Sequence, residues 1–100
     1  MIIHQREIIY RGKYPEFFKA LVELKAYMEK KYPETSVELM YNLAGKRGRA
    51  TMQIRYPSLA DYERIDAAAD NDEEYNKLLE SIITPEDLPV DQFYRVIQSG

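Results

Sequence analysis

Residues 36–56, SVELMYNLAGKRGRATMQIRY, contain the pattern that decides the fold. On each side of a short basic segment, apolar and polar residues alternate with a period of two, as in a β-strand with one buried face. The expected strands cover residues 36–43 and 49–56. Between them, Gly45 and Gly48 can adopt the positive φ angles of a tight turn. We therefore predict an antiparallel β-hairpin.

Both strands of this hairpin have one apolar face and one mainly polar face. The apolar residues are Val37, Leu39, Tyr41 and Leu43 in the first strand and Ala50, Met52, Ile54 and Tyr56 in the second. The opposite faces include Glu38, Asn42, Gln53 and Arg55. A sheet must bury its apolar face against another layer, so we expect the flanking segments to cover it.

An amphipathic helix is predicted before the hairpin, over residues 14–31. Pro15 suits its first turn, where a missing N–H costs no hydrogen bond. Apolar residues then recur at spacings of four, three and four, at Phe17, Leu21, Leu24 and Met28. This spacing places them on one face of the helix. Tyr32-Pro33 ends the helix, because a residue that precedes proline avoids the helical conformation.

A second helical stretch follows the hairpin and is interrupted once. Ser58 is a good N-cap, and Asp61 three residues later completes a pattern close to a capping box. Asp70-Asn71-Asp72 then interrupts the helix, and Asn71 or Asp72 is expected to cap a second segment that continues to residue 83. We predict one broken helix that follows the curvature of a twisted sheet.

Two more strands are predicted near the ends of the chain, over residues 2–10 and 90–97, with a proline-containing linker over 84–89. The order of elements is then β-α-β-β-α-β, which is the split βαβ or ferredoxin-like arrangement. Right-handed crossovers place both helices on one face of a four-stranded antiparallel sheet. The predicted fold class is therefore α+β, in a single domain over residues 1–100.

The composition argues against several classes of partner. A net charge of −3 and a pI near 5.2 disfavour nucleic acid, because phosphate binding requires clustered positive charge. The absence of cysteine excludes disulfides and thiolate chemistry and fits a cytoplasmic protein. No stretch approaches the roughly 20 apolar residues of a membrane span, and the first residues lack the apolar run of a signal peptide. We expect neither a nucleic-acid nor a membrane partner.

The sheet face that the helices leave uncovered is expected to mix polar and apolar residues. Two such faces packed together would enclose a cavity with a polar lining, which predicts a sheet-to-sheet homodimer with room for a small-molecule ligand. The residues predicted to line this cavity are His4, Arg6, Glu38, Asn42, Gln53 and Arg55. Strand periodicity supports Glu38 and Arg55 on the open face but does not decide between Arg6 and Glu7.

Two motifs resemble the dimeric α/β-barrel superfamily. Arg11-Gly12-Lys13 followed by Glu16-Phe17 is similar to its first strand-to-helix turn. Tyr56-Pro57-Ser58-Leu59, then Tyr62 and Asp72-x-x-Tyr75-x-x-Leu78-Leu79, resembles the second-helix signature of its NIPSNAP-like branch. The resemblance spans nearly the whole chain and implies a ferredoxin-like protomer that forms a barrel with a second copy. The superfamily includes antibiotic-biosynthesis monooxygenases (ABM-like) and haem-degrading enzymes, so the resemblance implies no single reaction.

His4, the one histidine, is the candidate for acid–base chemistry. It is either a general base in the cavity or an ordinary strand residue, since no second chemical group is tied to it by spacing. In the haem-degrading relatives the ligating histidine lies on a helix, so that role does not transfer to a strand residue. The acids around position 72 lack the EF-hand pattern, and the basic loop at 46–49 lacks a phosphate-binding pattern. We expect no cofactor and no metal.

Three functions are consistent with the sequence. The first is the binding of a small polar or aromatic molecule in the barrel, between sheet and helices. The second, implied by the superfamily, is a cofactor-independent monooxygenase or isomerase that acts on a phenolic or polycyclic substrate. The third is a purely structural interaction module, which would require a filled barrel. A cavity walled by His4, Glu38 or Arg55 would favour the first two.

Overall fold

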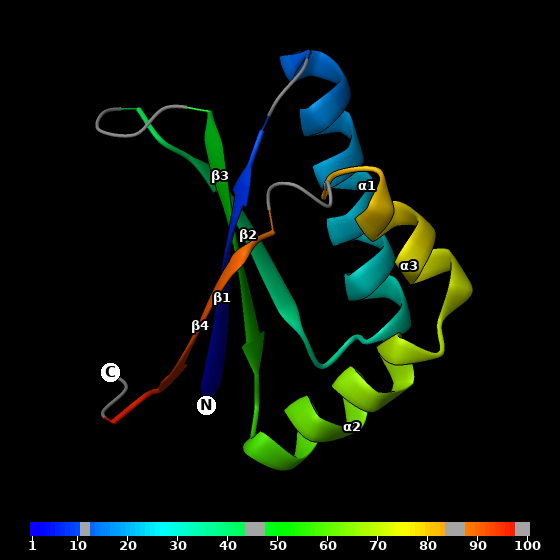
Figure 1. Ribbon diagram of the computed structural model, residues 1–100. Coiled ribbons are helices and arrows are strands. Elements are labelled where there is room, and N and C mark those ends of the chain that lie inside the picture. Colours follow the sequence, from blue (N-terminus) through cyan, green and yellow to red (C-terminus); the bar gives the residue numbers. More distant parts are fainter. Residues whose placement is uncertain (11–12, 44–47, 84–87, 98–100) are drawn as a thin grey trace.

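The computed structural model describes residues 1–10, 13–43, 48–83 and 88–97. Over these residues the chain forms β1 (Ile2–Ile9), α1 (Tyr14–Lys31), β2 (Ser36–Tyr41), β3 (Arg49–Tyr56), α2 (Leu59–Asp70), α3 (Glu73–Glu80) and β4 (Val90–Arg95), in that order (Figure 1). This order confirms the predicted ferredoxin-like arrangement. Most of the predicted hairpin loop, the first two residues of the turn at 11–13 and residues 84–87 of the linker lie outside the described residues.

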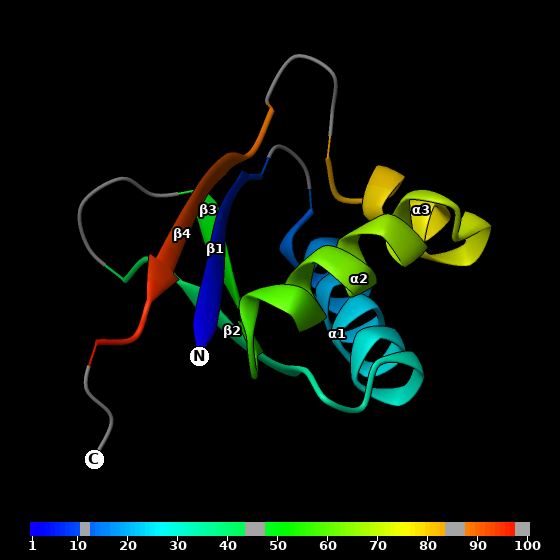
Figure 2. The ribbon, with the colours of Figure 1, turned by 90° about the horizontal axis from the view of Figure 1, so that it is seen from below.

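The four strands form one antiparallel sheet in the order β2-β3-β1-β4. The helices lie on one face of this sheet, and the opposite face is left open (Figure 2). β1 and β3 are the central strands, and β2 and β4 are the two edges. Because side chains alternate between faces, the register Ile2↔Tyr56 and Ile8↔Ala50 directs the apolar residues of both central strands toward the helices.

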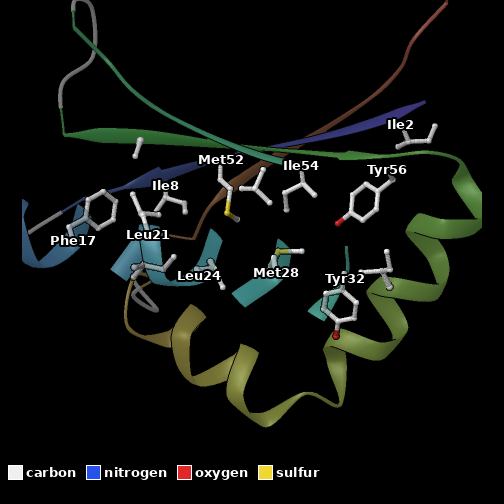
Figure 3. Close-up of a cluster of buried hydrophobic side chains, with 14 residues drawn as sticks. Ile2, Ile8, Phe17, Leu21, Leu24, Met28, Tyr32, Met52, Ile54 and Tyr56 are labelled. Carbon is white, nitrogen blue, oxygen red and sulfur yellow. The ribbon is translucent and has the colours of Figure 1, made fainter. Parts of the chain in front are cut away.

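The core lies between the central strands and α1 (Figure 3). The stripe predicted for α1 is buried, as are the alternate residues predicted for β3. The large side chains with less than 2% exposure are Ile8, Leu24, Met28, Met52, Ile54 and Ile65. Each side chain of this size contributes roughly 2 kcal/mol when it is fully buried. The core therefore fixes the central sheet against α1.

The second helical stretch is divided at the predicted place. The Ser58 hydroxyl accepts a hydrogen bond from the Asp61 backbone N–H and caps α2. The Asp72 carboxylate accepts a hydrogen bond from the Tyr75 backbone N–H and caps α3. The sequence allows either Asn71 or Asp72 as the cap of the second segment, and the structure shows that it is Asp72. The break changes the direction of the chain, and α3 then packs against α1 (Figure 1).

Both edge strands are less buried than their sequences predict. β2 ends at Tyr41, which is 60% exposed, and Leu43 lies beyond the last residue paired with β3. The expectation that both belong to the buried face is wrong. In β4 all six side chains are exposed, because this strand lies at the edge of the sheet beyond the helices (Figure 2). Ile97 follows the strand and is almost fully exposed.

Candidate functional site

Three polar residues meet on the helix side of β1 and β4, and we call them the His4 cluster: His4, Arg6 and Asp91. In the register of the two strands, Arg6 lies opposite Asp91 and His4 lies opposite Phe93. Side chains opposite each other in antiparallel strands project to the same face. His4 is directed toward the helices together with its buried neighbours Ile2 and Ile8, so Arg6 and Asp91 also lie on that side.

Asp91 is the centre of the cluster. Its Oδ1 lies 2.8 Å from His4 Nε2 and 2.7 Å from Arg6 Nε. Its Oδ2 also accepts a longer bond, of 3.4 Å, from the Arg6 guanidinium. One carboxylate therefore holds both the imidazole and the guanidinium in place.

Aromatic rings enclose the imidazole of His4. The Phe93 ring is stacked on it, with ring centroids 4.4 Å apart and an interplanar angle of 14°. Tyr62, from the first turns of α2, contacts the Phe93 ring edge-on at 5.1 Å and lies 6.4 Å from His4. Tyr56 meets Tyr62 edge-on at 5.2 Å. His4 is thus 7% exposed although it neighbours an edge strand.

The charge state of the cluster follows from its burial and hydrogen bonds. Burial lowers the pKa of His4 below 6.5, its usual value, and this outweighs the opposing effect of Asp91. Burial acts to raise the pKa of Asp91, but the hydrogen bonds from Arg6 and His4 outweigh it and leave this pKa below its usual value. At neutral pH the imidazole is therefore neutral and the carboxylate ionised. Because the carboxylate only accepts, His4 Nε2 carries the proton and Nδ1 the basic lone pair.

Two phenols, the buried Tyr56 and the partly buried Tyr75, face the same region. Burial raises the pKa values of Tyr56 and Tyr75, so both stay protonated and are hydrogen-bond donors at neutral pH. Arg6 acts in the opposite direction on both groups, as a nearby positive charge. The site therefore combines a neutral base, one cation and neutral phenols, a set that suits a polar aromatic ligand better than a highly charged one.

A surface pocket adjoins the aromatic wall of the cluster. Its volume is about 310 Å³, and it is lined by Ile2, Leu59, Tyr62, Phe93, Tyr94 and Arg95. Phe93 and Tyr62 belong to both the pocket and the shell around His4. We call this pocket, together with the His4 cluster behind it, the β4 cleft. Its volume is at the lower end of the range of about 300–1,000 Å³ that is typical for small-molecule sites.

The structure separates the six residues that the sequence placed in one cavity. His4 and Arg6 face the helices and lie in the β4 cleft, so Glu7, and not Arg6, lies on the open face of the sheet. Glu38, Gln53 and Arg55 share the open face: Arg55 lies 3.7 Å from Glu38 and donates to Gln53 at 3.1 Å. Asn42 follows β2 and lines a different pocket, at the other end of the sheet. Within one protomer these six residues therefore lie in three places and do not share one lining.

Sequence reasoning missed Asp91, the residue that organises the cluster. Asp91 falls within the predicted last strand, but no spacing links position 91 to position 4 or 6. The register between β1 and β4 makes that link, and a sequence pattern does not specify a register between strands so far apart in the chain. Tyr62 and Tyr75 belong to the motif that resembles NIPSNAP-like proteins, and this motif gives them no role in a site.

Two absences apply to the described part of the chain. It contains no group of three or more His, Cys, Asp or Glu side chains placed to hold a metal ion. None of its helices combines the length and the apolar character needed to cross a bilayer.

Solved structures with a similar fold are known. No family model matches the sequence, and no curated protein matches it significantly. An uncharacterised NIPSNAP domain protein from Burkholderia xenovorans is 16% identical, with a TM-score of 0.75 over 96% of this chain and 94% of that one. SnoaB, a cofactor-independent oxygenase from Streptomyces nogalater, is 10% identical, with a TM-score of 0.75 over 98% and 94%. A proposed antibiotic biosynthesis monooxygenase from Caulobacter crescentus is 14% identical, with a TM-score of 0.77 over 97% and 90%.

The comparisons confirm the resemblance at the level of the fold. This chain has the fold that NIPSNAP and ABM-like proteins share, over nearly its whole length. At these identities the likeness concerns the fold, and the reaction has to be argued from the residues of the site.

Proposed function

We propose that the protein binds a small aromatic molecule with a polar group in the β4 cleft, between the sheet and the helices. The observation that carries this proposal is the buried His4, held by the partly exposed Asp91, behind an aromatic wall. An ionisable pair with shifted pKa values beside a pocket is typical of a functional site. The expected contact surface of the ligand is the aromatic wall, with its polar group directed toward the cluster.

The composition of the wall defines the ligand class. Phe93 is half exposed although its other side is stacked on His4, so a flat ring can pack against it without unfolding the strand. Such ring contacts contribute about 0.5–1.5 kcal/mol beyond the burial of area. Arg95 lies in the same pocket and favours an oxygen acceptor or a weak acid on the ligand.

A homodimer is the second part of the proposal. The open face carries ion pairs between neighbouring strands, Glu7–Arg49 at 2.5 Å and Glu38–Arg55 at 3.7 Å, together with the partly exposed apolar side chain of Met40. Locally neutralised charges and apolar patches suit contact with an identical face. Multi-angle light scattering should then give about twice the protomer mass of 11.8 kDa. A mass of one protomer at all concentrations would contradict the dimer and leave the ligand site untouched.

A cofactor-independent oxygenase or isomerase is the alternative function, and the neutral base of His4 favours it. Nδ1 could remove a proton from a carbon next to a carbonyl and leave a carbanion stabilised by the ring. In an isomerase the proton returns to another carbon. In an oxygenase the carbanion reduces O₂, and anthrone is converted with one O₂ into anthraquinone and one water. SnoaB, which has the same fold, is a cofactor-independent oxygenase.

Two measurements test the two functions. Isothermal titration calorimetry with 2-naphthol should show binding to the parent protein, and Phe93→Ala should weaken it about tenfold, which is about 1.4 kcal/mol. Lys19→Ala, at an exposed position of α1, should bind like the parent. No binding of 2-naphthol by the parent protein, or equal binding by Phe93→Ala, would contradict a site in the β4 cleft.

Oxygen consumption with anthrone then separates a binding protein from an enzyme. If His4 is a general base, His4→Gln should lower the rate by about 10²-fold or more while anthrone still binds. Binding without oxygen uptake above the spontaneous rate would contradict the oxygenase and support the binding protein.

A further inference from the structure

A second pocket lies at the opposite end of the sheet from the His4 cluster. Its aromatic lining consists of Tyr10, Tyr14, Phe17, Phe18 and Tyr41, and we call it the aromatic pocket. Tyr10 follows β1, Tyr41 ends β2, and the other three residues belong to the first turns of α1. His4 and Tyr10 are six residues apart along one extended segment, so the two sites are about 20 Å apart.

The rings form a continuous array. The Tyr10 ring lies 4.5 Å from Tyr14 and 4.4 Å from Phe17, measured between ring centroids. Phe18 lies 5.7 Å from both Tyr14 and Tyr41 and so connects the helix to the edge strand. The volume of the pocket is about 380 Å³, enough for a ligand of one or two fused rings.

These rings are more exposed than a structural cluster requires. Tyr14 is 51% exposed, and Tyr41 and Phe18 also present apolar surface to solvent. Burying such rings against a ligand is favourable, at about 25 cal/mol per Å² of apolar surface removed from water. An aromatic ligand would therefore bind here through ring contacts.

One polar atom of the pocket points to a more specific ligand. The hydroxyl of Tyr10 is buried and has no hydrogen-bond partner among the described residues. Burial raises the pKa of Tyr10, so the hydroxyl keeps its proton at neutral pH and remains a donor. Native structures pair nearly all buried polar groups, and each exception requires an explanation.

We propose that the aromatic pocket binds a small neutral aromatic ketone, whose carbonyl oxygen accepts a hydrogen bond from Tyr10. The ring of the ligand packs against Tyr14, Phe18 and Tyr41. The hydroxyl lies behind the pocket surface, and the half-exposed Tyr14 packs against Tyr10 with the two rings tilted by 39°. To admit the carbonyl, Tyr14 would turn to another rotamer. An anionic ligand is disfavoured, because the nearby Arg49 is already paired with Glu7 at 2.5 Å.

The pocket keeps its shape through backbone contacts that a ligand does not need to break. The Tyr10 N–H donates to the Gly48 carbonyl at 2.6 Å, which ties the end of β1 to the start of β3. Gly48 has φ +73°, and a Cβ at this position would lie 3.5 Å from the Tyr10 carbonyl oxygen. The aromatic pocket and the pocket of the β4 cleft share no lining residue, so this proposal does not depend on the function proposed for the β4 cleft.

The test compares 1-indanone with indane, two ligands that differ in one carbonyl. Changes in the ¹⁵N–¹H NMR spectrum should map 1-indanone to the first turns of α1 and to the end of β2. The parent protein should bind 1-indanone about tenfold more tightly than indane, and Tyr10→Phe should abolish this difference. Tyr27→Phe, which removes a phenolic hydroxyl that donates to Asp72 and belongs to neither pocket, should leave the affinity unchanged.

Two outcomes would overturn the proposal. The first is a binding result: either Tyr10→Phe and the parent protein bind 1-indanone equally, or the NMR changes caused by 1-indanone are confined to β4. The second concerns the premise: Tyr10→Phe removes an unpaired hydroxyl and should keep or raise the midpoint temperature of unfolding. A fall of several degrees would show that the hydroxyl already has a partner, such as an ordered water, and would remove the reason for the carbonyl.

Discussion

Asp72 and Asp91 are two partly or fully buried aspartates that each gather several hydrogen-bond donors, yet they occupy different kinds of place. Asp72 accepts bonds from Tyr27 at 2.6 Å and Lys31 at 2.7 Å, and its side chain is 4% exposed. Asp91 holds His4 and Arg6 at similar distances, but one third of its side chain is exposed.

The partners of Asp72 all belong to the framework. Tyr27, Lys31 and the more distant Tyr32 come from α1 or its end, and the Tyr75 backbone N–H belongs to the first turn of α3. One carboxylate therefore caps α3 and attaches it to α1. Such a node stabilises the packing of helices and leaves little for a ligand to contact.

The partners of Asp91 stand beside a pocket. His4 and Arg6 are chemically versatile groups, and the ring of Phe93 separates them from solvent only in part. The comparison shows that hydrogen-bonded carboxylates alone do not identify a functional site. Position on an edge strand, beside a pocket and next to a neutral base, is what distinguishes Asp91.

The largest effect is expected on stability, from Asp72→Ala. The substitution removes the N-cap of α3 and leaves the buried Tyr32 hydroxyl without its acceptor. A lost cap costs about 1 kcal/mol, and buried donors without partners add to it, so the free energy of unfolding should fall by about 2–4 kcal/mol. Urea titration followed by circular dichroism measures this change, and ligand binding at the β4 cleft should persist below the transition.

A matched control for that variant is Asp61→Ala, which removes a partly exposed carboxylate from the first turn of α2. The free energy of unfolding should fall by less than about 1 kcal/mol, because Asp61 is partly exposed and solvent screens its ion pair with the exposed Arg64. Equal losses in Asp61→Ala and Asp72→Ala would contradict the special role of Asp72.

The second effect is on binding, from Asp91→Asn. An uncharged amide no longer holds Arg6 as an ion pair, so the affinity for 2-naphthol should fall about tenfold, or about 1.4 kcal/mol. Stability should fall by only about 1 kcal/mol, because solvent already screens this partly exposed pair. Calorimetry and urea titration on one sample give both numbers. The distinction between the two aspartates fails if Asp91→Asn destabilises as much as Asp72→Ala and binds normally.

A third effect concerns acid. Because burial lowers the pKa of His4, the unfolded chain takes up its proton more readily than the folded one. Relative to His4→Gln, the parent protein should lose stability as the pH falls below 6.5, until the pKa of His4 in the folded protein is passed. Asp72 and Asp91 contribute acid sensitivity only below pH 3.8, since their pKa values are depressed. A parent protein that gains stability over His4→Gln between pH 6.5 and 5 would reverse the assigned sign.

The smallest effect is expected on the open face, from Glu38→Gln. Its partner Arg55 is 3.7 Å away and nearly half exposed, so the stability of the protomer should change by less than about 0.5 kcal/mol. Binding at the β4 cleft should not change. A tenfold loss of affinity would show that the open face contributes to the ligand site, as the sequence alone suggested.

The fold could be predicted from local sequence patterns, because each apolar pattern identifies the face of a helix or strand that must be buried. The alternation in 49–56 and the stripe beginning at Phe17 identify the two layers, and Asp72 reads as a cap from its position before two glutamates. The edges could not be predicted in the same way. Tyr41 and Leu43 continue the alternation of β2, but burial at an edge depends on how far the neighbouring layer reaches.

The β4 cleft could not be predicted in this way, because it depends on the register between β1 and β4 and not on the alternation within one strand. His4 and Arg6 were selected from sequence as polar strand residues, but their partner lies 85 or more positions away in the chain. Glu38, Gln53 and Arg55 have the same alternation and project to the opposite face. A period of two separates the faces of one strand and does not say which strands are neighbours.

The most direct test of the central claim is an NMR titration of the one imidazole in the chain. Two-bond ¹⁵N–¹H spectra of His4 report both its pKa and the nitrogen that carries the proton. We predict a pKa below 6.5 and a proton on Nε2, with a further decrease of the pKa in Asp91→Asn because the carboxylate raises it. A pKa at or above 6.5, or a proton on Nδ1, would contradict a neutral, Asp91-oriented base in the β4 cleft.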